Sequence, residues 1–210
     1  MKKAIVIGSG FGGLAIACRL RHYNFDVTLI EKQENLGGRA RSLTHNGFIY
    51  DAGPTVITAP YLIQELFSMH NKNWNEYFQL LKVKPYYRFI FSDNSHFDYG
   101  DNILQMVRQI KSNYSEKDAR GYIKLLKLSK RIFKTAYTEL SDKPFESIQS
   151  MIPYLPELMR IKFYKSVHSS VSSHIENENL IKALSMHPLL VGGNPYTTTS
   201  IYLLIQYLEW

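Results

Sequence analysis

The glycines near the start of the chain have the spacing of a loop that binds phosphate. The segment Gly8-Ser-Gly10-Phe-Gly-Gly13 fits the pattern G-x-G-x-x-G. In such a loop the first glycine makes the tight turn out of a strand, the second lets the backbone approach a pyrophosphate, and the third lets a helix pack on the strand. The N–H groups that begin this helix then face the phosphates. The candidate contacts are Gly8, Ser9, Gly10, Phe11, Gly12 and Gly13.

The segments on either side of the loop predict the elements that such a site needs. Residues 4–8 are a short apolar run rich in β-branched side chains, which is typical of a parallel strand buried on both faces. Residues 12–22 carry apolar side chains at core spacing and predict a helix that ends before Asn24. Residues 27–30 predict a second strand, and Glu31 follows it directly.

Glu31 stands where a carboxylate would meet a ribose. In dinucleotide-binding folds an acidic residue lies about 20 residues beyond the first glycine, at the end of the second strand. Its carboxylate accepts hydrogen bonds from the ribose hydroxyls and would repel a 2′-phosphate. The sequence therefore disfavours NADP as the ligand.

A second glycine-rich segment precedes an arginine. Leu36-Gly-Gly-Arg-Ala40 places Gly38 directly before Arg39. A guanidinium matches the geometry of a phosphate, so Arg39 is a candidate phosphate contact. The alternative is a solvated surface arginine. The later segment Asp51-Ala-Gly-Pro-Thr55 predicts a rigid turn, which by itself is an ordinary loop.

The middle of the chain predicts a basic amphipathic helix. Ser115-Glu-Lys-Asp118 is a capping sequence, and residues 115–140 then repeat apolar side chains every three or four positions. The opposite stripe consists of Lys117, Arg120, Lys124, Lys127, Arg131 and Lys134. The pattern favours packing of the apolar face on the protein over membrane contact, and membrane contact over nucleic acid. Residues 151–167 mix apolar and basic side chains and predict either a core helix opened by proline or a surface that dips into lipid.

Composition narrows the class of protein. The 210 residues are 45% hydrophobic and 20% charged, which excludes a disordered or collagen-like chain. One cysteine excludes an intrachain disulfide, and the seven histidines show no metal-binding spacing, so we expect no metal. No apolar run reaches the roughly 18 residues that span a bilayer. The net charge of +7 suits an anionic membrane surface or nucleic acid.

With these motifs the chain resembles the bacterial-type phytoene desaturases, which are FAD-dependent carotenoid desaturases of the flavin amine oxidase-like superfamily. The resemblance extends over essentially all of the chain. The early motifs are shared by many flavoproteins, whereas residues 189–202 are more specific to the desaturases. The matching segments are 8–15, 31–32, 36–40, 47–58, 65–67, 85–88, 121–122, 187–195 and 198–202.

The resemblance implies an α/β fold with an FAD-binding Rossmann-type (βαβ) domain and a partly helical, membrane-facing substrate region. We expect residues 1–70 to belong to the first and residues 71–210 to the second. The implied contacts to FAD are Gly8, Gly10, Gly13, Glu31, Lys32, Gly38 and Arg39, and the turn Gly53, Pro54 and Thr55 would lie near the isoalloxazine. No catalytic acid or base is assigned.

The implied reaction is the dehydrogenation of phytoene or a related long polyene towards lycopene-type products. The implied partners are this lipid-soluble substrate, a membrane surface, and oxygen or a quinone as electron acceptor, without nucleic acid. The location would be cytoplasmic and peripheral, at the inner face of the membrane. Members of the family are more than twice as long as this chain, so we expect an N-terminal fragment or a truncated gene product, incomplete in fold.

Three other functions stay open at this point. One is a sister carotenoid oxidase or isomerase. Another is an NAD-dependent dehydrogenase, against which the segments 37–39 and 51–55 argue. The last is not enzymatic: an inactive truncated flavoprotein fragment or a basic module that binds a membrane surface.

Overall fold

The computed structural model describes residues 1–53, 56–140, 149 and 152–209. The chain divides into two units, Met1–Leu81 and Lys82–Trp210, and each is described by itself. The boundary expected at residue 70, between a cofactor-binding domain and a substrate region, stays a prediction. In the structure, residues 71–81 belong to the first unit.

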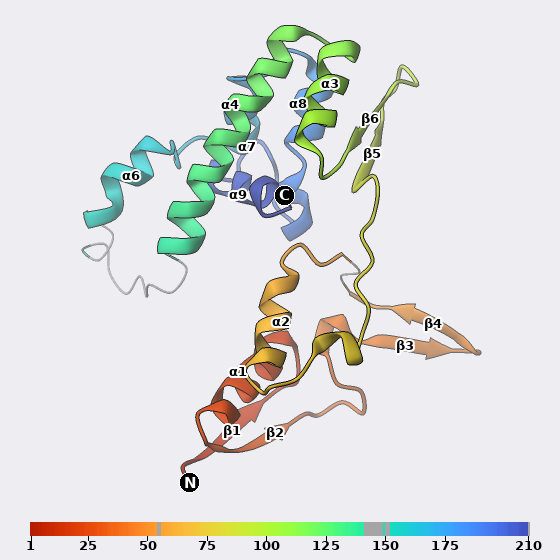
Figure 1. The fold of residues 1–210 in the computed structure, drawn as a ribbon, viewed down its shortest axis with the longest axis vertical. Coiled ribbons are helices and arrows are strands. Elements are labelled where there is room, and N and C mark those ends of the chain that lie inside the picture. Colours follow the sequence, from red (N-terminus) through yellow and green to blue (C-terminus); the bar gives the residue numbers. More distant parts are fainter. Residues whose placement is uncertain (54–55, 141–148, 150–151, 210) are drawn as a thin grey trace. The chain divides into compact units, whose positions relative to one another are not determined.

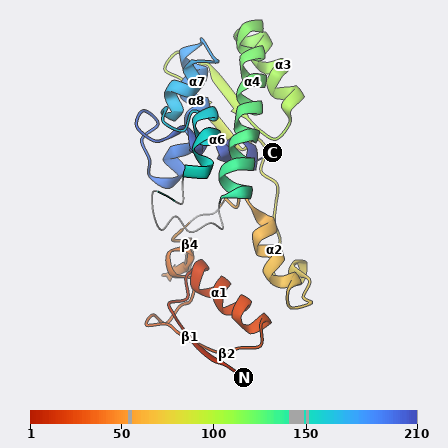
Figure 2. The same cartoon turned by 90° about the vertical axis from the view of Figure 1, so that its left-hand side faces the viewer.

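The first unit begins with a βαβ motif. Strand β1 (Lys3–Ile7) pairs in parallel with β2 (Asp26–Ile30), and helix α1 (Phe11–His22) connects them and lies against one face of the pair (Figures 1 and 2). Asn24 has a positive φ of 61°, which ends the helix and turns the chain into β2. The helix and the second strand expected from the sequence are thus confirmed to within a residue.

Burial of β1 on both faces, expected from its apolar run, is wrong for this structure. Val6 points towards α1 and is buried, whereas Ile5 and Ile7 on the other face are 68% and 84% exposed. Helix α1 packs on the pair, and alternate side chains of β1 and β2 remain exposed. A two-stranded sheet with one covered face buries little apolar surface.

The rest of the first unit builds on the end of this motif. A 3-10 turn, a hairpin and a further helix follow in order. Their bounds are Gly38–Ala40, β3 (Ser42–His45), β4 (Phe48–Asp51) and α2 (Pro60–Ser68), with a last 3-10 turn at Trp74–Glu76. Arg19 of α1 bonds Glu65 of α2 at 3.1 Å, which ties the two helices together.

The second unit is mainly helical. It opens with the antiparallel hairpin β5 (Tyr87–Ile90) and β6 (His96–Tyr99), and α3 then packs beside α4 (Figures 1 and 2). The helices are α3 (Ile103–Asn113), α4 (Glu116–Ile132), α6 (Leu155–Arg160), α7 (Val167–Ser172), α8 (Glu178–Leu184) and α9 (Leu204–Leu208). 3-10 turns span Ile152–Tyr154, His187–Val191 and Ser200–Leu203.

The capping sequence before α4 forms as predicted. Ser115 Oγ accepts a hydrogen bond from the Asp118 N–H at 2.9 Å, and Asp118 also receives the N–H of Glu176 at 2.7 Å. The expected helix over 115–140 changes character at Phe133, where a π-helical segment (Phe133–Glu139) begins. Its wider turn stacks Phe133 on Tyr137 at 4.9 Å.

The apolar face of α4 packs in the core of its own unit, as the sequence favoured. Tyr122, Leu125 and Ile132 are fully buried there. All six basic residues of the opposite stripe are exposed. The helix therefore offers charge rather than apolar surface to its surroundings. Among the described residues, none of the helices combines the length and the apolar character needed to cross a bilayer.

Candidate dinucleotide-binding site

The first turn of the site joins the ends of the two parallel strands. The Gly8 N–H donates to the carbonyl of Ile30 at 2.8 Å, and Gly8 takes a φ of 93° that side chains disfavour. This turn carries the chain from β1 into the loop at the carboxyl edge of the pair. That edge is where doubly wound folds bind their ligands.

The third glycine of the motif allows α1 to lie against the loop. A Cβ built on Gly13 would overlap the carbonyl oxygen of Gly8 and lie 3.0 Å from its carbonyl carbon. It would also lie 3.7 Å from a methyl group of Val6. Position 13 thus has room for hydrogen alone, as the motif requires.

The loop is open where a ligand would approach. A Cβ on Gly10 or on Gly12 would meet nothing within 4 Å. Gly10 is the N-cap of α1, and no side chain caps the N–H groups of the first turn. Those groups and the positive end of the helix dipole suit an anion such as a pyrophosphate.

Glu31 is held ionised at the end of β2. Its Oε2 accepts from the Ser9 N–H at 2.8 Å and from Ser9 Oγ at 2.7 Å, and its Oε1 accepts from the Gln33 N–H at 3.0 Å. The hydrogen bond from the Ser9 hydroxyl is the largest cause that lowers the pKa of Glu31, from 4.5 to about 2. An ionised carboxylate accepts hydrogen bonds only, which is what a ribose diol requires.

Ser9 has a structural role that sequence reasoning missed. It is fully buried and turned towards Glu31, and its carbonyl accepts the N–H of Gly37 at 3.0 Å. A small polar side chain inside the glycine motif, with an acid ending the next strand, was the available signal. The expected contact of Ser9 with a cofactor stays a prediction.

The second glycine-rich segment meets the first. Gly10 and Gly37 form an isolated parallel bridge, and a Cβ on Gly38 would lie 3.1 Å from the Cα of Gly10. Gly37, which was not among the predicted site residues, takes a φ of 105°. Arg39 follows on the 3-10 turn next to the open loop, and its side chain is exposed.

The predicted turn after β4 also reaches this segment. A Cβ on Gly53 would overlap the carbonyl oxygen of Arg39 and lie 2.8 Å from the Cα of Ala40. The Ala52 N–H donates to the carbonyl of Arg41 at 3.0 Å. The segments of the predicted site therefore lie next to one another in space. They are residues 8–13, 31, 37–40 and 53. Pro54 and Thr55, also predicted for the site, lie outside the described residues.

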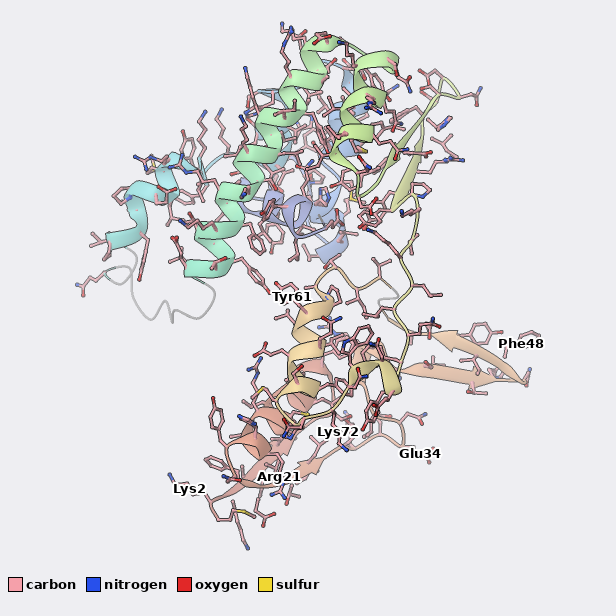
Figure 3. The ribbon with its side chains drawn as sticks, in the orientation of Figure 1. Lys2, Arg21, Glu34, Phe48, Tyr61 and Lys72 are labelled. Carbon is pink, nitrogen blue, oxygen red and sulfur yellow. The ribbon has the colours of Figure 1, made fainter. Side chains whose placement is uncertain are left out.

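Other side chains at this end of the unit face solvent. Lys32 is exposed, and Phe11 at the start of α1 is 61% exposed. Figure 3 shows Phe48 at the turn of the β3–β4 hairpin, directed away from the strands, and Glu34 on the loop that follows β2. The expected cofactor contacts of Phe11 and Lys32 stay predictions.

Replacement of Ser9 by alanine should raise the pKa of Glu31 from about 2 towards 4.5. Because the pKa is lowered in the folded unit, the stabilisation from Glu31 is present above pH 4.5 and is lost as the pH falls towards 2. In Ser9→Ala the pKa of Glu31 in the folded unit lies closer to 4.5, so this stabilisation is smaller and is lost over a narrower range of pH. An NMR titration of the Glu31 carboxyl measures the shift, with Ser42→Ala as control because Ser42 bonds Asp51 instead. An unchanged Glu31 titration in Ser9→Ala would show that the hydroxyl has no such effect.

The βαβ motif, its glycine loop and the acid at the end of β2 define an α/β fold of the Rossmann-like, dinucleotide-binding class. Residues 6–78 match the family described as NAD(P)-binding Rossmann-like domain. Among solved structures, a variant of putrescine oxidase with a redesigned cofactor site is 16% identical with a TM-score of 0.56. The likeness covers 97% of this chain and 40% of that protein, and it shows the fold.

Over its whole length the chain is similar to phytoene desaturases. It is 44% identical over 209 residues to the lycopene-forming phytoene desaturase of Pantoea ananas, and 42% identical to that of Pseudescherichia vulneris. In both comparisons the similarity covers 100% of this chain and 42% of the relative. The chain thus spans about two fifths of the length of these curated relatives. The resemblance expected from the motifs is confirmed.

Proposed function

We propose that this chain supplies the dinucleotide-binding part of an FAD-dependent desaturase that dehydrogenates phytoene or a related polyene in carotenoid biosynthesis. The observation that carries the proposal is an open glycine loop beside an ionised Glu31, in a chain similar from end to end to phytoene desaturases. The reaction would remove two hydrogens from adjacent carbons beside existing double bonds.

The residues fit such a cofactor. The backbone at Gly10 gives a pyrophosphate room to approach, and the start of α1 offers N–H groups without a capping side chain. The Glu31 carboxylate would accept hydrogen bonds from the ribose hydroxyls, and the exposed Arg39 would pair with a phosphate. When bound, FAD would accept the two electrons that the dehydrogenation releases. The chain itself binds and orients the cofactor.

The chemistry of the substrate argues for work at a membrane surface. At about 0.8 kcal/mol for each buried CH₂ group, a C40 polyene would cost on the order of 30 kcal/mol to carry through water. Such a molecule stays in the bilayer, so the enzyme must come to it. We therefore include in the proposal a peripheral place at the cytoplasmic face, with oxygen or a quinone as the final acceptor.

The proposal is tested by cofactor binding to the purified chain. We expect quenching of FAD fluorescence and no competition from NAD. Gly10→Ala should weaken FAD binding by about 5- to 150-fold, because its methyl group enters the space that the phosphates need. A misfit of this kind costs about 1–3 kcal/mol, and 1.4 kcal/mol is a factor of ten. Gly100→Ala is the matched control, because a Cβ there also meets nothing within 4 Å and the residue lies in the second unit, outside the loop.

Turnover is tested separately, with phytoene in vesicles and added FAD. New visible chromophores in the extracted pigments would indicate desaturation, a carbonyl would indicate an oxidase, and an unchanged mass with a shifted spectrum an isomerase. Binding of NAD in place of FAD would overturn the proposal in favour of a dehydrogenase. Equal effects of Gly10→Ala and Gly100→Ala would overturn the role given to the loop.

A further inference from the structure

A pocket of about 730 Å³ lies in the second unit, at the end of α4 and along the π-helical segment that follows. It is separate from the dinucleotide loop, which belongs to the first unit. Four basic side chains line it, together with two aromatic rings, two threonines and two glutamates. The basic residues are Lys127, Lys130, Arg131 and Lys134.

The four basic residues share one face of the helix. They stand at positions i, i+3, i+4 and i+7, where like charges repel by a few tenths of a kcal/mol per pair. Arg131 pairs with Glu157 at 2.8 Å, and Lys134 with Glu139 at 3.8 Å. The structure gives no carboxylate partner for Lys127 or Lys130 among the described residues. The pocket therefore has a surplus of positive charge that an anion would neutralise.

The lining of the pocket also includes aromatic rings and hydroxyl groups. Phe133 and Tyr207 contact each other with ring centres 5.2 Å apart, and the Lys130 ammonium lies 5.8 Å from the Tyr207 ring centre. Thr135 and Thr138 add hydroxyl groups to the lining. Basic side chains, hydroxyl donors and aromatic rings in one lining suit a phosphate group joined to an organic residue.

The neighbouring helix α6 and the turn before it carry exposed apolar side chains. Figure 1 shows α6 alongside the final turns of α4, and the Arg131–Glu157 ion pair joins the two helices. On the α6 side Ile152, Leu155 and Met159 are each roughly half exposed. Apolar side chains next to basic ones are the pattern by which helices lie in the interface of an anionic membrane.

We propose that this pocket binds the phosphate head group of an anionic membrane lipid, while Ile152, Leu155 and Met159 enter the acyl region beside it. The inference deepens the proposed work at a membrane surface and rests on it. It assigns that contact to the pocket rather than to the basic stripe as a whole. Nucleic acid is disfavoured because the neighbouring helix α6 exposes apolar side chains.

The test compares two double variants with the same change in net charge. Lys127→Glu with Lys130→Glu alters the pocket, and Arg108→Glu with Lys124→Glu alters exposed bases outside its lining. Both are sedimented with phosphatidylglycerol vesicles and with phosphatidylcholine vesicles. We expect wild type to bind the anionic vesicles, the pocket variant to bind at least tenfold more weakly, and the control to lose under threefold. Each basic residue near an anionic surface is worth about 1 kcal/mol, so two account for the tenfold loss.

A second arm separates a lipid head group from free phosphate. Calorimetric titration with inorganic phosphate should show binding at least tenfold weaker than to the vesicles. Tight binding of inorganic phosphate without vesicle binding would overturn the lipid as the source. Equal losses in the two double variants would also overturn the pocket, because they would reflect net charge alone.

Folding and the first site are controlled in the same samples. Circular dichroism and FAD binding should be the same in wild type and in both variants, so that failure of the pocket is distinct from failure of the flavin proposal. If the pocket variant is misfolded, Lys127→Gln with Lys130→Gln replaces it and is compared with Arg108→Gln with Lys124→Gln, with the same ordering expected. Absence of vesicle binding by wild type would overturn the head-group site and leave the flavin proposal standing.

Discussion

Gly13→Ala is expected to break the βαβ motif and to abolish dinucleotide binding. By helix propensity alone, alanine in α1 would be favoured by about 1 kcal/mol. Its methyl group, however, would overlap the carbonyl oxygen of Gly8. Relief requires α1 to move away from β1, or Gly8 to give up its hydrogen bond to Ile30. Overpacking of this kind costs about 1–3 kcal/mol, and the first unit has few buried side chains to offset it.

Amide hydrogen exchange measures this effect where it arises. In Gly13→Ala the amides of β1 and α1 should exchange faster, FAD binding should be lost, and the amides of the second unit should keep their protection. Gly12→Ala is one residue away and unobstructed, so it should leave protection unchanged or raise it. If Gly13→Ala proved as stable as Gly12→Ala, the close packing of α1 on the loop would be refuted.

The sequence specified those features that depend on neighbours along the chain. The strand, the glycine loop and the helix follow from local spacing, and the acid at the end of β2 follows from the same pattern. The Ser115 cap is also local, since its partner Asp118 lies three residues away. The packing of the apolar face of α4 followed from its periodicity, because a wide apolar stripe is stable only when covered.

Features that depend on distant partners were not specified. The apolar run of β1 fits a fully buried strand, yet which faces are covered depends on what packs there, and Ile5 and Ile7 remain open. The pairing of Ser9 with Glu31 needs the two strands in register before it exists. The spacing of apolar residues does not predict the π-helical segment after α4, because residues three and four apart share a face there as they do in an α-helix.

His187→Ala is expected to destabilise the second unit by about 1–3 kcal/mol, because it leaves the buried Glu209 carboxyl without one hydrogen-bond partner. His187 Nε2 and Glu209 Oε2 lie 3.0 Å apart, and their side chains are 1% and 4% exposed. Tyr87 donates to the same carboxyl at 3.2 Å, and burial with the nearby Glu209 raises the pKa of Tyr87 to about 12. The pair joins the segment after α8 to the end of α9, and the His187 ring also packs edge-on against Tyr99.

A double-variant cycle separates the pair from its surroundings. Glu209→Gln keeps an acceptor for Tyr87 and should cost less than His187→Ala. The cycle consists of His187→Phe, Glu209→Leu and their combination. The combination removes both members of the pair and should recover much of the stability, with only the partly buried Tyr87 hydroxyl losing its acceptor. Urea unfolding followed by circular dichroism gives the free energies. Coupled neighbours depart from additivity by about 0.5–3 kcal/mol, so additive effects on the free energy of unfolding would show that the two side chains are not coupled. A loss of less than about 1 kcal/mol of stability in His187→Ala would likewise show that the bond does not hold the unit together.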